Sequence, residues 1–267
     1  MARTTIRTED VTAGAISATD KASNSITATQ IAANAIGNSE MADDAVGINE
    51  LSATGTASAT TFLRGDNAWA SAAAGLESVQ VFTASATWTK PTGITKVIVH
   101  VQGAGGASVD TTGPAGSGGG GAGGYACKLL DVTNIDTATV TIGAGAAAST
   151  GGASTFAKLA GSGSFTDVVG NGGVVATSGY TSDPVAGGTA TGGDINIQGG
   201  MGAGCNGNDS NQWGGNSHFG SGGRPLSTGD PRSQQGQGPG AGASGGNSGS
   251  GVGKAGNDGA VYVWEYK

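Results

Sequence analysis

Glycine is concentrated in one part of this 267-residue chain. Of its 54 glycines, five lie in residues 1–71 and the other 49 in residues 72–267. An average protein contains about 7 % glycine. Glycine loses more conformational freedom on ordering than any other residue and brings no side chain to a core. Residues 72–267 must therefore order themselves largely through contacts and hydrogen bonds between backbones, or else act as flexible linkers.

The glycine spacing excludes a collagen triple helix, which needs glycine at every third position. Gly236, Gly238 and Gly240 break that rule. A structureless linker of about 70 residues is uncommon inside a domain, and here a predicted strand follows it. We therefore expect extended, polyglycine-II-like segments that pack side by side and hydrogen-bond laterally. The fold of residues 161–251 stays open, because that stretch offers little beyond its glycine content.

Alternating apolar and polar residues predict strands around and between the glycine runs. The last of these, residues 260–266, has an aliphatic face that ends in Glu265 and an aromatic face formed by Tyr262, Trp264 and Tyr266. Residues 88–94 predict a turn, in which Gly93 can adopt a positive φ. We expect a mainly β fold with a β-sandwich-like domain. Its predicted strands are residues 77–83, 95–102, 124–132, 137–143, 154–160 and 260–266.

Residues 1–71 contain an internal repeat of ten residues. Two apolar columns recur five positions apart, and an acid or amide precedes the first column. A straight α-helix turns about 100° per residue, so neither column stays on one stripe. In a straight strand, positions i and i+5 point to opposite faces. The repeat therefore predicts short extended pieces that are broken by turns.

One copy of this repeat buries too few side chains to offset an ordering cost of about 1–2 kcal/mol per residue. We therefore expect residues 8–54 to form a fibrous shaft in which identical chains, most economically three, supply each other's core. A loose, alanine-rich helical segment is the alternative. The residues predicted to mediate oligomerisation are Val11, Ile16, Ile26, Ile31, Ile36, Met41, Val46 and Leu51.

The net charge and the hydropathy pattern exclude some classes of binding partner. The formal net charge is −7 and the pI about 4.6, which argues against nucleic-acid binding because phosphates need clustered Lys and Arg. No apolar run is long enough for a membrane-spanning helix, so we expect no membrane insertion. The N-terminal residues lack the apolar stretch of a signal peptide. Cys127 and Cys205 have no metal-ligand spacing; we favour two unrelated buried thiols over one disulfide.

Candidate catalytic residues are few. The two histidines are His100, within a predicted strand, and His218, in a predicted loop. His100 is best explained as a structural strand residue, and His218 has no second histidine at ligand spacing. Gly103–Gly106 follow a strand as a phosphate loop would, but neither the helix nor the lysine of such a loop comes after them. We therefore expect a protein that is not an enzyme and that has no cofactor and no metal site.

One stretch between residues 205 and 224 differs from its glycine-rich surroundings, because amides, a carboxylate, an arginine and aromatic rings gather there. Aromatic rings can stack on the apolar faces of sugars while polar groups bind the hydroxyls. The same aromatic residues could instead form a small core that pins a long loop. The candidate glycan-binding residues are Asn206, Asn208, Asp209, Asn211, Trp213, Asn216, His218, Phe219 and Arg224.

Parts of both regions of the chain, residues 1–71 and residues 72–267, resemble bacteriophage tail proteins. The decapeptide array around Thr29–Ile36 and the segment Thr61–Trp69, which contains Phe-Leu-Arg-Gly-Asp, are similar to repeats of phage tail fibres and the stretch that follows them. The order of elements in residues 79–160 and 252–267, from Trp88-Thr89 through the glycine runs to the final strand, resembles the glycine-rich domain of phage tail proteins. The Arg-Gly-Asp tripeptide is explained by this resemblance better than by integrin binding.

The resemblance implies a phage tail fibre or tail-tip protein that recognises the host surface. Residues 1–71 would attach the chain to other tail or virion proteins and trimerise it, and residues 72–267 would bind a host glycan or outer-membrane receptor. Such a protein is made in the host cytoplasm and ends in the virion. A purely structural virion component, such as a head fibre, baseplate part or capsid decoration, is the alternative; a bacterial adhesin fits less well, since an export signal is lacking.

Overall fold

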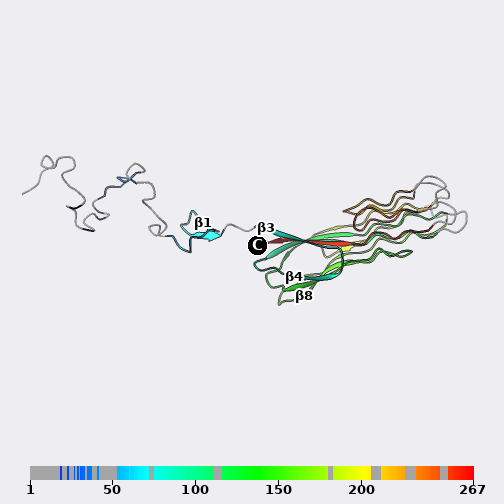
Figure 1. The fold of residues 1–267 in the computed structure, drawn as a ribbon, viewed down its shortest axis with the longest axis horizontal. Coiled ribbons are helices and arrows are strands. Elements are labelled where there is room, and N and C mark those ends of the chain that lie inside the picture. Colours follow the sequence, from blue (N-terminus) through cyan, green and yellow to red (C-terminus); the bar gives the residue numbers. More distant parts are fainter. Residues whose placement is uncertain are drawn as a thin grey trace, which may run out of the picture. The chain divides into compact units, whose positions relative to one another are not determined.

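The chain forms two compact units, Met1–Ala72 and Ala73–Lys267, called unit 1 and unit 2 below. Figure 1 presents the computed structural model. No α-helix occurs among the residues that it describes, and every pair of named strands is antiparallel. The structure describes residues 19, 23, 27, 29, 31–33, 35–37, 41, 53–59, 61–71, 75–110, 116–179, 183–205, 212–225, 233–246 and 252–267.

Unit 1 contains a short hairpin of β1 (Thr61–Leu63) and β2 (Trp69–Ser71). Its turn holds the Arg-Gly-Asp tripeptide, with Asn67 in the left-handed region at φ 59°. Of the predicted oligomerisation residues, Ile31, Ile36 and Met41 are described, and all three side chains are exposed in the single chain. The others, Val11, Ile16, Ile26, Val46 and Leu51, lie outside the described residues.

Unit 2 is built on two five-stranded sheets that share one core (Figure 1). The first, which we call the aromatic sheet, has the order β11-β6-β5-β12-β3, and the second has the order β10-β9-β8-β7-β4. The strands are β3 (Leu76–Phe82), β4 (Ala86–Thr89), β5 (Lys96–Gln102), β6 (Tyr125–Asp131), β7 (Thr137–Thr141), β8 (Ser154–Ala160), β9 (Val168–Gly170), β10 (Ala190–Thr191), β11 (Ile195–Ile197) and β12 (Ala260–Tyr266).

The six predicted strands are confirmed as β3, β5, β6, β7, β8 and β12. The predicted split of the last strand is also confirmed, since Val261, Val263 and Glu265 are fully buried while the aromatic residues between them are not. Gly93 adopts the expected positive φ, at 84°. The predicted turn started too early, however, because Trp88 belongs to β4 and pairs with Ala138 of β7.

Trp88 and Glu265 connect the two sheets inside the core. The Trp88 indole is fully buried, and its ring centroid lies 5.7 Å from that of Phe156. Its Nε1 donates a hydrogen bond of 2.7 Å to Glu265 Oε1. Gln80 Nε2 and the Ser78 hydroxyl also donate to this carboxylate. Three donors thus replace the water that the buried carboxylate loses on folding.

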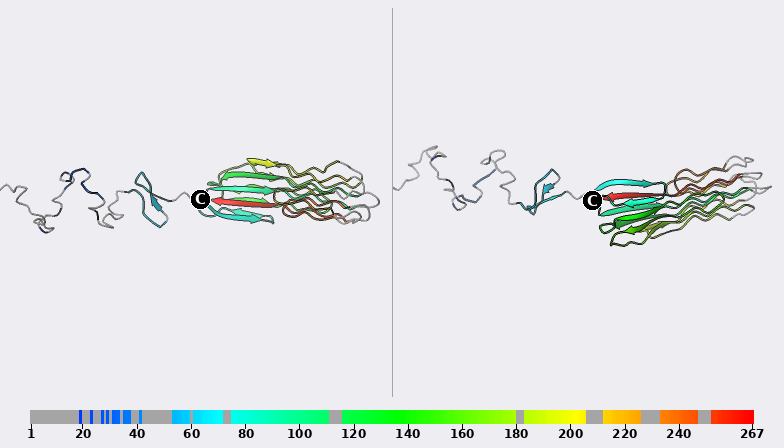
Figure 2. Two further views of the ribbon diagram at one scale, coloured as in Figure 1. Left: turned by 90° about the horizontal axis from the view of Figure 1, so that it is seen from above. Right: turned by 60° about the horizontal axis from the view of Figure 1, so that its bottom comes forward.

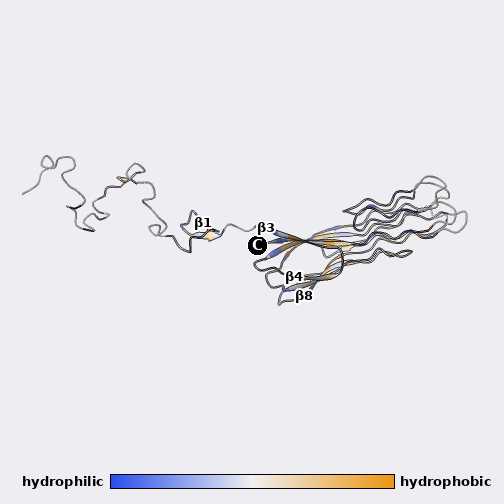
Figure 3. Cartoon of the chain, in the orientation of Figure 1, coloured by the Kyte–Doolittle hydropathy of each residue, from blue (hydrophilic) through white to orange (hydrophobic). Residues whose placement is uncertain are grey.

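Beyond the strands, the chain continues as extended glycine-rich segments that fill the other end of unit 2 (Figure 2). Hydropathy changes along the unit, because the most hydrophobic residues gather in the strands (Figure 3). We call these stretches the glycine segments; their described residues are 103–110, 116–124, 171–179, 183–189, 198–205, 212–225, 233–246 and 252–259.

Backbone hydrogen bonds between the glycine segments repeat every third residue. In residues 116–124, successive N–H groups donate to three different neighbouring segments in rotation, whereas a strand would alternate between two sides. A repeat of three matches the three residues per turn of polyproline II. The donor–acceptor pairs are Ser117–Gly246, Gly120–Ala243 and Gly123–Gly240 to one neighbour, Gly118–Thr177, Gly121–Val174 and Gly124–Asn171 to the second, and Gly119–Ala203 and Ala122–Gly200 to the third.

Neighbouring backbones occupy the space that side chains would need. A Cβ added at Gly119, Gly120 or Gly121 would lie 2.0–2.1 Å from the carbonyl oxygen of Trp213, Gly106 or Ala186, respectively. These oxygens belong to three different segments. At these three positions the neighbouring backbones leave no room for a side chain.

Two sequence expectations concern cysteines and membranes. Cys127 and Cys205 are not joined by a disulfide; Cys205 is buried as predicted, but Cys127 is only half-buried. Within the described part of the chain, no helix combines the length and apolarity needed to cross a bilayer.

Candidate functional site

The predicted glycan-binding residues separate into two places. Asn206, Asn208, Asp209 and Asn211 lie outside the described residues. Trp213 and Arg224 pair with each other near the end of the glycine segments that is far from the C-terminus. His218 and Phe219 instead pack on the aromatic sheet. Asn216 supports the turn between these places, because its Oδ1 accepts a hydrogen bond of 2.7 Å from Gly222 N–H.

Trp213 and Arg224 lie on two neighbouring stretches of the glycine segment 212–225, which hydrogen-bond through Gly214 N–H and the Gly223 carbonyl at 3.0 Å. The Arg224 guanidinium carbon is 5.8 Å from the centre of the indole ring, within the range of a cation–π contact. Trp213 keeps 48 % of its surface exposed. The pair therefore offers a flat apolar face beside several hydrogen-bond donors.

Several glycine segments lie side by side near this pair. Ser117 N–H donates to the Gly246 carbonyl, Gly118 N–H to Thr177, and Ala203 N–H to the Trp213 carbonyl. These contacts bring residues far apart in sequence to the same end of unit 2. The opposite end holds the C-terminus, where Lys267 Nζ forms an ion pair of 2.7 Å with Glu77 Oε1 (Figure 2).

The second place is a cluster of six rings on the outer face of the aromatic sheet, which we call the aromatic cluster. The His218 ring stacks on Tyr125 with centroids 3.9 Å apart, and Phe219 packs at 4.8 Å from Tyr262. Four of the rings line an apolar hollow of about 270 Å³. The cluster consists of His100, Tyr125, His218, Phe219, Tyr262 and Trp264.

His100 is the polar centre of the aromatic cluster. Its Nδ1 shares a hydrogen bond of 2.7 Å with the Tyr125 hydroxyl, and its Nε2 is buried without a hydrogen-bond partner. Burial, and then the nearby His218, lower the pKa of His100 below its usual value. Burial also raises the pKa of Tyr125. Both groups therefore stay neutral at pH 7, as an apolar environment requires.

Gln102 positions the loop that carries His218 and Phe219. Its side chain is fully buried where β5 continues into a glycine segment. Gln102 Nε2 donates to the Gly123 carbonyl at 2.8 Å, and Oε1 accepts from His218 N–H at 3.3 Å. One amide thus bridges a glycine segment and the aromatic cluster. No sequence signal indicated this role.

Sequence reasoning also missed four members of the aromatic cluster as site residues: His100, Tyr125, Tyr262 and Trp264. The alternation in β12 did indicate an aromatic face. The alternation did not indicate that residues 218 and 219 pack against this face. His100 lies in a strand as predicted, and no group of His, Cys, Asp or Glu in the described ranges could hold a metal ion.

No protein-family model matches the chain, and no curated protein matches it. The residues and their geometry are therefore the basis for assigning a function.

Proposed function

We propose that this chain is a bacteriophage tail-fibre or tail-tip protein that recognises the surface of the host cell. The observation that carries the proposal is the convergence of glycine segments at one end of unit 2, next to the exposed Trp213–Arg224 pair. Segments held by hydrogen bonds every third residue make a stiff support for a binding surface. The resemblance of Thr61–Trp69 and of the glycine runs to phage tail proteins supports the same assignment.

The recognition surface contains Trp213 and Arg224 and binds a host glycan or an outer-membrane receptor. The exposed face of the indole can stack on the apolar face of a sugar ring. The guanidinium offers five N–H donors to hydroxyl or carboxylate oxygens at the edge of that ring. We infer that the glycine segments are polyglycine-II-like helices, whose backbone bonds fix the spacing between this pair and its neighbours.

Unit 1 attaches the protein to other tail or virion proteins and assembles it as a trimer. The exposed Ile31, Ile36 and Met41 support this part of the proposal, because these apolar side chains are left uncovered in the single chain. Three identical chains wound together would bury them. Native mass spectrometry of the purified full chain tests the assembly: a trimer is expected, and a monomer would contradict it.

Cell binding tests the recognition. Fluorescently labelled full-length chain should bind cells of the host of the phage that encodes it. Trp213→Ala and Arg224→Ala should each weaken binding about tenfold, which corresponds to a loss of about 1.4 kcal/mol. Leu159→Ala is the matched control, since Leu159 is an apolar residue of similar exposure (57 % against 48 % for Trp213) on β8 of the second sheet. Equal binding by all four proteins would refute the recognition surface, and no binding by any would favour a purely structural virion component.

A further inference from the structure

We propose that the outer face of the aromatic sheet is the surface through which unit 2 contacts unit 2 of other copies of this chain. The inference rests on the proposed assembly of copies by unit 1, and it assigns a second, separate contact. It concerns a different face from the Trp213–Arg224 pair.

The register of the strands arranges the outer face in rows that cross the sheet. One row runs through Val79, Trp264, Ile98 and Leu129, which are directly opposite one another on neighbouring strands. Residues opposite each other on antiparallel strands share a face. The next row is Val81, Tyr262, His100, Cys127 and Ile195.

The two rows at the centre of this face contain no Lys, Arg, Asp or Glu. Lys96 and Asp131 are opposite each other at one rim, and Lys267 pairs with Glu77 near the same end. An uncharged centre rich in Trp, Tyr and Phe, with ions kept to the rim, is the composition of protein–protein interface cores. A glycan site would need more polar groups near its centre.

Large apolar side chains form an exposed patch on this face. Seven of them are between 37 % and 56 % exposed. The half-buried rings beside them enlarge the patch. The largest apolar patch of a typical monomer is about 300–600 Å², and a standard interface covers about 800 Å² on each partner. The exposed side chains are Val79 (47 %), Val81 (56 %), Leu129 (55 %), Ile195 (55 %), Ile197 (43 %), Phe219 (37 %) and Trp264 (40 %).

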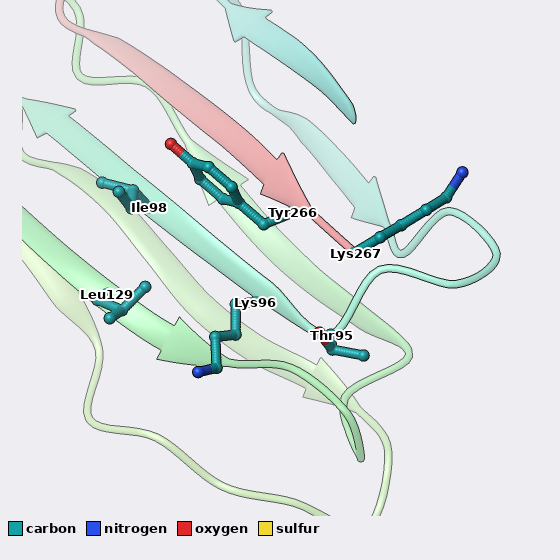
Figure 4. A pocket seen from close by; sticks show the side chains of 6 residues that line it. All are labelled: Thr95, Lys96, Ile98, Leu129, Tyr266 and Lys267. Carbon is teal, nitrogen blue, oxygen red and sulfur yellow. The ribbon is translucent and has the colours of Figure 1, made fainter. Parts of the chain in front are cut away.

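The shape of this face, which has two hollows, fits a partner with protruding side chains. A hollow of about 460 Å³ lies beside Ile98, Leu129 and Tyr266, whose side chains point to the same side of their strands (Figure 4). The smaller hollow of the aromatic cluster lies further along β12. Leu129 and Val81 are both more than half exposed on the same face. The face therefore combines hollows that a second copy could fill with apolar side chains that it could cover.

The stretch of chain between unit 1 and the aromatic sheet is short. The edge strand β3 begins at Leu76, four residues after unit 1 ends at Ala72. Four extended residues span at most about 14 Å. Copies joined through unit 1 therefore hold their β3 strands close, at an effective concentration of about millimolar. Three sheets that turn the same face inward would exclude the apolar rows from water.

Hydroxyl-radical footprinting of the full chain tests this contact. Trp213 is an internal reference, because its exposed fraction in the single chain is close to that of Trp264. We expect Trp264 to be oxidised at least fivefold more slowly than Trp213. The double variant Val81→Glu, Leu129→Glu should bring the Trp264 rate up to that of Trp213, while the native mass stays that of the assembly held by unit 1. Leu159→Glu, on the second sheet, should change neither rate.

The possible outcomes separate the two contacts. Equal rates for Trp264 and Trp213 in an oligomeric wild-type chain would overturn the contact and leave the assembly by unit 1 intact. A monomeric wild-type chain would overturn both. Slow oxidation of Trp264 that persists in the double variant would also overturn the contact. If the double variant does not fold, the ratio of the two oxidation rates in the wild-type chain still distinguishes a covered face from an open one.

Discussion

Replacing Gly121 by alanine should destabilise unit 2, whereas the same change at Gly75 should have little effect. The new Cβ at position 121 would lie 2.0 Å from the Ala186 carbonyl oxygen, and a Cβ at position 75 would meet nothing within 4 Å. Neither glycine has a positive φ. Comparing the two variants therefore measures the steric effect of the added methyl group, without a contribution from an unfavourable backbone conformation.

The size of the effect follows from the contacts of Ala186. Its carbonyl oxygen accepts a hydrogen bond of 3.1 Å from Val174 N–H. Making room for the methyl group moves this oxygen by more than about 1 Å, since carbon atoms in contact stand about 3.5 Å apart. Overpacking costs about 1–3 kcal/mol, and leaving a buried donor unpaired costs about 1–3 kcal/mol more. Alanine also lowers the conformational entropy of the unfolded chain, which offsets about 0.4–1 kcal/mol of this loss in stability.

We therefore expect Gly121→Ala to lower the free energy of unfolding by about 1–5 kcal/mol and Tm by about 3–15 °C, because a unit of this size loses about 2–4 °C per kcal/mol. Far-UV circular dichroism of the full chain during heating and in urea measures both. Gly75→Ala should stay within about 0.5 kcal/mol of the wild type. A Gly121→Ala protein as stable as Gly75→Ala would refute the direct packing of backbones.

Three further predictions concern single side chains. Glu265→Leu should lower the urea midpoint by an amount equivalent to about 2–4 kcal/mol, because Trp88 Nε1 and Gln80 Nε2 lose their acceptor; an unchanged midpoint would contradict this. Acidification from about pH 6.5 should reduce stability, since His100 has a lowered pKa in the folded state and the unfolded chain takes up its proton first. His100→Gln should flatten that slope in urea titrations at several pH values, and a slope as steep as that of the wild type would refute the assignment. Gly93→Ala should cost about 1–2 kcal/mol in thermal unfolding because its φ is +84°, and a smaller loss than that of Gly75→Ala would be inconsistent with this turn.

The strands of unit 2 could be predicted where side chains alternate. Residues 96–102 and 260–266 show a period of two over seven residues, and both are strands. β4 was missed because Pro91 and Gly93 are strong turn signals and Trp88 precedes them closely. β9, β10 and β11 have only two or three residues each, which is too short to establish a period.

The partners of the glycine segments could not be predicted from the sequence. Their contacts join backbone N–H and carbonyl groups, which are chemically the same at every residue. Nothing in the sequence marks Gly121 as the donor to Val174 and Gly120 as the donor to Ala243. The need for glycine could be inferred, because only glycine lets backbones approach so closely.

The candidate site was predicted in part. Aromatic and polar residues between 205 and 224 stand out from their surroundings in the sequence, and Trp213 and Arg224 do pair. The separation of His218 and Phe219 from that pair depends on Gln102, Tyr125 and Tyr262, which come from other strands. Such contacts have no local sequence signal.

Native-state amide hydrogen exchange of the full chain tests most directly whether the glycine segments form the rigid body of unit 2. The amides of Gly106, Gly120 and Gly121 donate to carbonyls of neighbouring segments at 2.7–3.0 Å and lie in buried residues. They should exchange within about tenfold of the amides of β5 and β12, because both groups would open only with the whole unit. Exchange at the rate of an unfolded chain would show that the segments are linkers, and would contradict their packing as a rigid body.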